Sequence, residues 1–210
     1  MLEELLIMRL VLSILIFCLS LSATAQDKTL LVLGDSISAG YGISLEQSWV
    51  YLLKKRLQDS GYRYKVKNAS ISGDTTRGAR ERLSKIIAEE KPDISIIELG
   101  GNDGLRGLSL TEMSANLDVV INELAKTGSH VLLVPMRLPP NYGPYYNDRF
   151  EAVYTDVATR HAVTLSKFIL QGIAEHADLM QSDGIHPRAQ AQPLMLDNVW
   201  ESLLPLLVKY

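Results

Sequence analysis

The sequence predicts an α/β fold, in which a central parallel sheet is covered by helices on both faces as a three-layer α/β/α sandwich. Short, continuous apolar runs alternate along the chain with longer stretches whose apolar residues recur at helical spacing. A strand buried on both faces of a sheet gives the first pattern, and a surface helix gives the second. Strands that alternate with helices in this way form parallel sheets through right-handed crossovers.

Five apolar or β-branched segments are expected to form the strands of this sheet. The first, residues 29–33, consists of a threonine followed by three leucines and a valine, as expected of a strand with no solvent-exposed face. The remaining strands are predicted at residues 64–69, 93–99, 130–135 and 163–168.

Between the strands, the spacing of apolar residues predicts helices. These helices are expected at residues 45–60, 75–90, 111–127, 145–161 and 189–208. Gly61 lies where a C-cap is needed and Pro92 follows the second helix, while Thr111 is expected to cap the third ahead of Glu112. The chain contains no internal repeat and no long linker, so residues 26–210 are expected to form one domain.

Composition argues against a nucleic-acid-binding protein. The chain has 210 residues, of which 47% are hydrophobic and 21% charged, and this is ordinary globular usage. A formal net charge of -3, without any block of Lys and Arg interleaved with aromatic residues, argues against a nucleic-acid partner. We expect a monomer that acts on small molecules.

The first 25 residues have the pattern of a secretory signal peptide. Arg9 precedes an apolar run over residues 10–21, and the small residues Ala23 and Ala25 form an Ala-x-Ala cleavage site. Acidic residues before Met8 are unusual in such a peptide and suggest Met8 as the true start. The apolar run is shorter than the ~20 residues of a membrane span, so a mature chain without stable membrane insertion is expected, in the periplasm or secreted.

Polar residues and glycines follow three of the predicted strands. Ser36 comes directly after the first strand, Gly73 follows the second, and Asn102 follows the third. Because ligands bind at the carboxyl ends of parallel strands, these residues are expected to face one crevice. Each motif alone also fits a turn or a helix cap.

Asp183 and His186 form a further pair near the C-terminus. An acid three residues before a histidine, in a loop with Gly184 and Pro187, can support both side chains from one short segment. The carboxylate would accept from Nδ1–H and leave Nε2 to take a proton from a serine hydroxyl. The other three histidines lie near strand or helix ends, where capping or surface positions are expected.

Four segments together resemble the sequence blocks of the SGNH (GDSL-type) hydrolases, in the order that this family has. They are Gly34-Asp35-Ser36, Gly73, Gly101-Asn102-Asp103 and Asp183-Gly184-Ile185-His186. Residues 68–75, 98–107 and 137–143 are also similar to one subgroup, the periplasmic thioesterase I/protease I/lysophospholipase enzymes. The resemblance implies the flavodoxin-like fold of the family and an esterase or thioesterase that needs no metal or other cofactor.

By this resemblance, Ser36 is the nucleophile, His186 the general base and Asp183 the residue that orients the imidazole. The oxyanion hole would consist of the N–H groups of Ser36 and Gly73 and the amide of Asn102. The substrates implied are fatty acyl thioesters, lysophospholipids and simple aryl esters.

An apolar groove is needed if the acyl chain is long. The candidate substrate-binding residues are Asp35, Leu105, Leu108, Pro139, Tyr142 and Ile185. One departure from the subgroup is the pair Pro139-Pro140, where a proline is usually followed by alanine. The second proline stiffens the loop and removes a backbone donor, so chain-length preference is expected to differ if this loop borders the groove.

Three alternatives remain open. A carbohydrate acetylesterase would use the same three catalytic residues with a shallow pocket. A non-catalytic module could grip a phosphate or sugar with glycine-rich strand ends, although no G-x-x-x-x-G-K-[ST] motif is present. A two-metal phosphoesterase would use Asp35, Asn102, Asp103, Asp183 and His186, but such sites usually contain several histidines.

Overall fold

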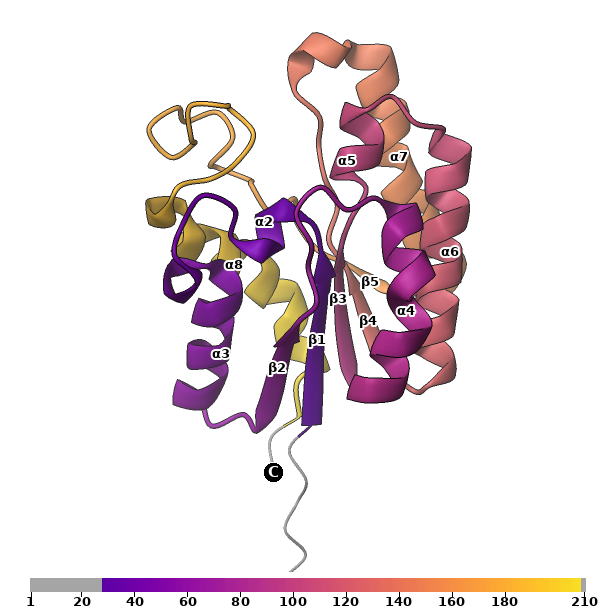
Figure 1. Cartoon of the computed structure of the whole chain (residues 1–210), viewed down its shortest axis with the longest axis vertical. Helices are drawn as coiled ribbons and strands as arrows, with labels where there is room; N and C mark the ends of the chain where they lie inside the picture. The colour runs from indigo at the N-terminus through magenta and orange to yellow at the C-terminus, as the bar shows by residue number, and fades with distance from the viewer. Residues whose placement is uncertain (1–27, 209–210) are drawn as a thin grey trace, which may run out of the picture.

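Five parallel strands form the central sheet of the computed structural model, which describes residues 28–208 (Figure 1). The strands are β1 (Lys28–Gly34), β2 (Tyr64–Asn68), β3 (Ile94–Glu98), β4 (His130–Leu133) and β5 (Thr164–Leu165). Their order in the sheet is β2-β1-β3-β4-β5, and every neighbouring pair is parallel. The predicted signal peptide, residues 1–25, lies outside the described residues.

The two central strands explain why the apolar runs are continuous. β1 pairs with β3 in a register that sets Leu30 opposite Ile94 and Val32 opposite Ile96, and all four side chains are buried. Because helices cover both faces of the sheet, alternate residues of these strands meet apolar neighbours on either side. The amide of Thr29 also donates to Asp93 Oδ2 at 2.8 Å, which fixes the start of the pairing.

Helices form the two outer layers of the sandwich. In Figure 1, α3 (Trp49–Asp59) and α8 (Gln192–Leu203) lie on one side of the sheet, whereas α4 (Thr76–Glu90), α6 (Leu110–Lys126) and α7 (Pro144–His161) lie on the other. Two short helices, α2 (Ser36–Ala39) and α5 (Gly101–Leu105), follow β1 and β3 at the carboxyl edge of the sheet. The α/β/α sandwich expected from the sequence is confirmed.

Some predicted boundaries are wrong for identifiable reasons. Ser109, not Thr111, caps α6, because its hydroxyl accepts from the amide of Glu112 at 3.3 Å and Leu110 is already helical. The last strand has two residues rather than six, since the chain turns away from the sheet after Ser166.

Two of the predicted helices are interrupted. The predicted helix 45–60 is divided into the 3-10 turn Leu45–Gln47 and α3, because Ser48 is extended and caps α3. The predicted helix 189–208 consists of Ala189–Ala191, α8 and Leu204–Leu206, of which the first and last are 3-10 turns. Pro205 lies in the last of these turns and has no N–H with which to continue α8.

The core beside α5 is aromatic and closely packed. Phe150 and Tyr154 of α7 are fully buried and meet edge to face, with ring centroids 5.5 Å apart. The hydroxyl of Tyr154 donates to the carbonyl oxygen of Leu99 at 2.9 Å, just before α5 begins. This bond and the packing around it hold the carboxyl end of β3. Across residues 28–208, the helices are all too short or too polar to span a membrane.

Candidate active site

Ser36 is presented by a sharp turn between β1 and α2. Asp35 is the N-cap of α2, and its carboxylate accepts from the amide of Ile37 at 3.0 Å, so that Ser36 becomes the first helical residue. Gly34 has no room for a side chain, because an added Cβ would lie 2.7 Å from Glu98 Oε2 and 2.8 Å from Ser38 Cβ. Glycine at the end of β1 therefore lets the backbone lie close to Glu98 of β3 and to Ser38 of α2.

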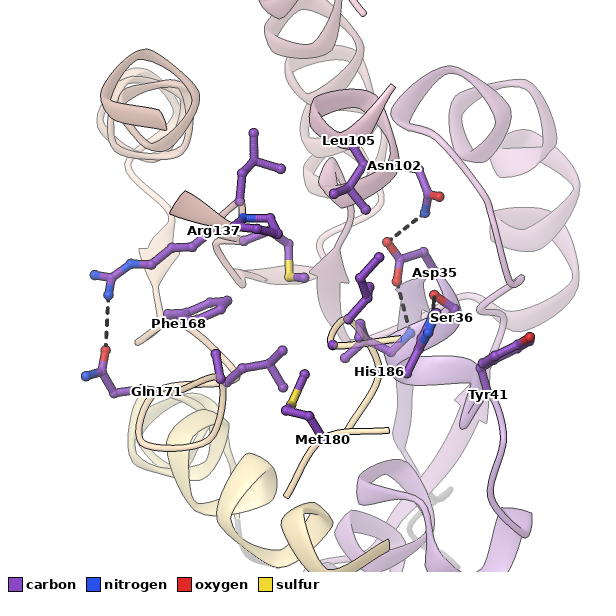
Figure 2. A pocket seen from close by; sticks show the side chains of 18 of the residues that line it. Asp35, Ser36, Tyr41, Asn102, Leu105, Arg137, Phe168, Gln171, Met180 and His186 are labelled. Carbon is purple, nitrogen blue, oxygen red and sulfur yellow. Dashed lines mark hydrogen bonds between the residues drawn. The ribbon is translucent and has the colours of Figure 1, made fainter. Parts of the chain in front are cut away.

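The side chains of Ser36, His186 and Asp183 form one continuous hydrogen-bonded row. Ser36 Oγ lies 2.8 Å from His186 Nε2 (Figure 2). His186 Nδ1 in turn lies 2.7 Å from Asp183 Oδ2. With Nδ1 protonated against the carboxylate, Nε2 is an acceptor directed at the serine hydroxyl. An imidazole placed in this way can take the proton of the hydroxyl as the oxygen attacks a carbonyl carbon.

Asp183 is held in place by its own loop. Its Oδ1 accepts from the amides of Ile185 and His186 at 2.9 and 3.0 Å. Partial burial alone would raise the pKa of Asp183, but these amides and the His186 imidazole outweigh it and lower the pKa to about 2. The carboxylate is therefore ionised throughout the neutral range and can stabilise a protonated imidazole.

Gln181 ties this loop to the loop that follows α2. Its amide donates to the carbonyl oxygen of His186 at 2.7 Å, and its Nε2 donates to the carbonyl oxygens of Tyr41 at 2.8 Å and Pro187 at 3.1 Å. The ring of Tyr41 lies against His186, with centroids 4.5 Å apart. These contacts fix the loop that contains His186, and with it the imidazole, relative to Ser36.

Gly73 and Asn102 reach the same crevice from neighbouring strand ends. Gly73 has φ 80°, a conformation that favours glycine, and Asn102 lies in the first turn of α5 after Gly100 with φ 108°. Within residues 28–208, no hydrogen bond uses the N–H of Ser36 or of Gly73. These two donors are available to a ligand beside Ser36.

A cavity of about 610 Å³ opens at Ser36 and extends away from it between the loops at the carboxyl edge (Figure 2). Its wall is mainly apolar and comes from segments that are far apart in the sequence. The apolar lining residues are Ile37, Leu105, Met136, Leu138, Pro139, Pro140, Phe168, Leu170, Ala174, Met180 and Ile185. Arg137 and Gln171 lie at the end remote from His186, where Arg137 Nη1 is 3.5 Å from Gln171 Oε1. Such a cavity suits an elongated apolar group.

Of the six groove residues expected from the sequence, four line the cavity and two do not. Asp35, Leu105, Pro139 and Ile185 line the cavity together with Ser36, Gly73, Asn102 and His186. Leu108 and Tyr142 are not in the lining. The side chain of Leu108 is 43% exposed at the turn before α6, whereas the hydroxyl of Tyr142 donates to the Leu105 carbonyl oxygen at 2.8 Å and supports the wall from behind.

Several lining residues were not identified from the sequence. Phe168, Leu170 and Met180 follow the last strand, where the general rule for parallel sheets places binding residues, but they belong to no recognisable motif. Tyr41 was likewise missed. The pair Pro139-Pro140 does border the cavity, so the departure from the subgroup pattern falls in its wall.

Two buried carboxyl groups lie beneath Ser36. Burial raises the pKa of Asp35 to about 6, although hydrogen bonds from Ile37 and Asn102 oppose the rise. Glu98 is fully buried, and burial together with the charge of Asp35 raises its pKa well above the usual value. Glu98 Oε2 accepts from Ser38 Oγ at 2.7 Å, while Oε1 has no partner among the described residues. Those residues contain no cluster of three His, Cys, Asp or Glu side chains that could bind a metal.

Comparison with known proteins identifies the family of the chain. Residues 32–193 match the model of the GDSL-like lipase/acylhydrolase family. The chain is 50% identical over 193 residues to esterase TesA of Pseudomonas aeruginosa, covering 90% of this chain and 96% of that protein. It is 39% identical to thioesterase 1/protease 1/lysophospholipase L1 of Escherichia coli, covering 90% of this chain and 88% of that one.

A solved structure gives the same result for the fold. The esterase EstA of Pseudoalteromonas sp., inhibited by monoethylphosphonate, superposes with a TM-score of 0.82 at 37% identity, covering 85% of this chain and 98% of that chain. The protein therefore belongs to the GDSL-like lipase/acylhydrolase family, the SGNH hydrolases, and is an enzyme of the esterase type.

Proposed function

We propose that this enzyme is a serine hydrolase that cleaves acyl esters and thioesters through an acyl-enzyme on Ser36. The observation that supports it is the row of hydrogen bonds from Ser36 Oγ through His186 to Asp183 Oδ2, at 2.8 and 2.7 Å. A hydroxyl is a weak nucleophile on its own, and an adjacent, oriented imidazole is the usual means of activating it.

In the first half of the proposed reaction, Ser36 Oγ attacks the carbonyl carbon and its proton passes to His186 Nε2. The carbonyl oxygen becomes an oxyanion that accepts from the N–H groups of Ser36 and Gly73 and from the Asn102 amide. When the intermediate collapses, the bond to the leaving oxygen or sulfur breaks, and His186 gives its proton to the departing alcohol or thiol. One such oxyanion donor contributes about 3 kcal/mol in the transition state.

The second half repeats the chemistry with water. His186 takes a proton from the water that attacks the acyl-enzyme, and then returns it to Ser36 Oγ as the carboxylic acid leaves. Asp183 remains ionised throughout and stabilises the imidazolium that forms in each half. None of these steps requires a metal or an organic cofactor.

We infer that the acyl group is medium or long, as in fatty acyl thioesters, lysophospholipids and aryl esters of fatty acids. Apolar side chains such as Met136, Leu138 and Phe168 form the wall of the cavity that opens at Ser36. An acetyl group would leave most of this surface in contact with water, whereas a longer chain would bury it. A carbohydrate acetylesterase is therefore the less favoured alternative.

The test is a series of p-nitrophenyl esters from acetyl to palmitoyl, hydrolysed by wild type, Ser36→Ala and Ser44→Ala. Ser44 is the matched control, because it lies in the same segment and its exposed hydroxyl donates only to the side chain of Gln47 among the described residues. We expect an optimum at medium or long chains and a loss of several orders of magnitude in kcat for Ser36→Ala alone. An optimum at acetyl would assign the enzyme to acetylated substrates, and activity that survives in Ser36→Ala would refute the serine mechanism.

We also propose that the enzyme acts in the periplasm or outside the cell. The support is the signal-peptide pattern of residues 1–25 in the sequence. N-terminal sequencing of the protein recovered from the periplasm or medium is expected to begin at Gln26. An intact N-terminus in the cytoplasmic fraction would contradict this proposal.

A further inference from the structure

We propose that Asp35 and Arg106 are positioning residues that hold the side-chain amide of Asn102 with its N–H directed at the oxyanion. The inference rests on the proposed hydrolase function and adds to it two residues that do not touch the reacting atoms. Their contacts decide which end of the amide faces the substrate.

An asparagine amide can bind in two orientations, and its neighbours select one of them. Asn102 Nδ2 donates to Asp35 Oδ2 at 3.0 Å, and Asn102 Oδ1 accepts from Arg106 Nη2 at 3.5 Å. An ionised carboxylate only accepts and a guanidinium only donates, so the reversed amide would oppose like groups at both ends. Nδ2 has two hydrogens, and the one not used by Asp35 remains available to the oxyanion.

Asp35 is the stronger of the two contacts and is itself fixed. It is 2% exposed, and its two oxygens have different partners: Oδ1 accepts from Ile37 in α2, and Oδ2 accepts from Asn102 in α5. One carboxylate therefore joins the helix that begins with Ser36 to the helix that contains Asn102. Figure 2 shows the bond between Asp35 and Asn102 beside Ser36.

Capping α2 does not explain a buried acid at this position. A serine or threonine hydroxyl would accept from the amide of Ile37 equally well and would avoid burying a charge. A charge on Asp35 lies close to Glu98, and the charge of Asp74 also disfavours the ionisation of Asp35. Among the neighbouring titratable groups, only His186 favours the ionised form of Asp35. A hydroxyl has a single oxygen, whereas the carboxylate has two, one placed at the amide of Ile37 and the other at Asn102 Nδ2.

Arg106 provides the second contact from the surface. Its Nη2 donates to the carbonyl oxygen of Gly73 at 2.8 Å as well as contacting Asn102 Oδ1. The 3.5 Å contact is at the upper limit for a hydrogen bond, so Arg106 is expected to contribute less than Asp35. Its position nevertheless links the loop of Gly73 to Asn102, the two residues that complete the proposed oxyanion hole.

A double-mutant cycle separates positioning from a general structural role. Asp35→Ser keeps an oxygen that can cap α2 but lacks the second oxygen that reaches Asn102. We expect it to lower kcat for a p-nitrophenyl ester ten- to hundredfold, with a change in KM below threefold, because oxyanion contacts act mainly in the transition state. In the Asn102→Ala background, the same substitution is expected to change kcat less than threefold.

An equal loss of kcat with and without Asn102 would overturn the role of Asp35, as would a loss confined to KM. Should Asp35→Ser fail to fold, Arg106→Gln at the surface provides the same cycle, with an expected three- to tenfold loss of kcat that shrinks in the Asn102→Ala background. Arg77→Gln, which removes an exposed arginine paired with Glu81, is the control and is expected to leave kcat unchanged. Ser36→Ala tests the hydrolase mechanism separately, so a failure of the proposed function would not be confused with a failure of this inference.

Discussion

Replacing the buried Asp35 by asparagine is expected to stabilise the protein progressively, relative to wild type, as the pH rises from about 4 to about 7. Folding raises the pKa of Asp35 from 3.8 to about 6. Between these values the folded protein binds more protons than the unfolded chain, so its stability falls with increasing pH until Asp35 is ionised in both states. A difference of about 2 pKa units corresponds to roughly 3 kcal/mol.

Urea unfolding of wild type and Asp35→Asn at pH 4 and pH 8 measures this change. The variant loses hydrogen bonds to Ile37 or Asn102, and that offset is expected to be similar at both pH values. The free energy of unfolding of the variant minus that of wild type should therefore rise by about 3 kcal/mol from pH 4 to pH 8. Asp59→Asn, at an exposed position on α3, controls for the loss of one negative charge.

A difference that is flat with pH would refute the reasoning, because it would mean that the protein tolerates the ionised form of Asp35 as easily as water does. A difference that falls with pH would have the wrong sign and would show that neighbouring donors outweigh burial.

Three further outcomes are expected. Phe150→Ala should lower the free energy of unfolding by about 3–5 kcal/mol in urea titrations, because it empties a fully buried site beside Tyr154; a loss below 1 kcal/mol would contradict the packing described. Gly100→Ala should lower the melting temperature measured by circular dichroism, since φ is 108° and the new Cβ would clash with the Tyr154 hydroxyl; unchanged melting would show that this turn can shift freely. EDTA should leave p-nitrophenyl ester hydrolysis unchanged, because the proposed steps use only Ser36, His186 and Asp183; inhibition reversed by added metal would support a metal-dependent reaction instead.

The layers of this fold can be predicted from the sequence because burial on both sides leaves a simple signal. In β1 the run over residues 30–33 is apolar at every position and fully buried, as expected of a strand covered on both faces. The boundaries are harder to predict. Ser109 and Thr111 are both competent caps, and the choice between them depends on packing of Leu110 against the core, which the local sequence does not specify.

The candidate site likewise has residues that the sequence predicts and residues that it does not. Ser36, Asp183 and His186 lie in short motifs with glycine and proline, and they lie within hydrogen-bonding distance in the structure; their catalytic role remains a prediction. The wall of the cavity is different, since Phe168 and Met180 resemble ordinary core residues until the loops are placed in space. Their part in the site follows from contacts between distant segments and not from any local pattern.

The order of these segments along the chain has a consequence for the newly made protein. Ser36 follows the first strand, whereas His186, 150 residues later, precedes the last helix. Two hydrogen bonds join these ends of the chain directly. Gln181 Nε2 donates to the Tyr41 carbonyl oxygen, and the amide of Trp49 donates to Gln192 Oε1 at 2.8 Å. A chain that has not yet docked its C-terminal segment therefore has a serine without a base, so hydrolysis cannot return during refolding before this segment has joined the N-terminal part of the sheet.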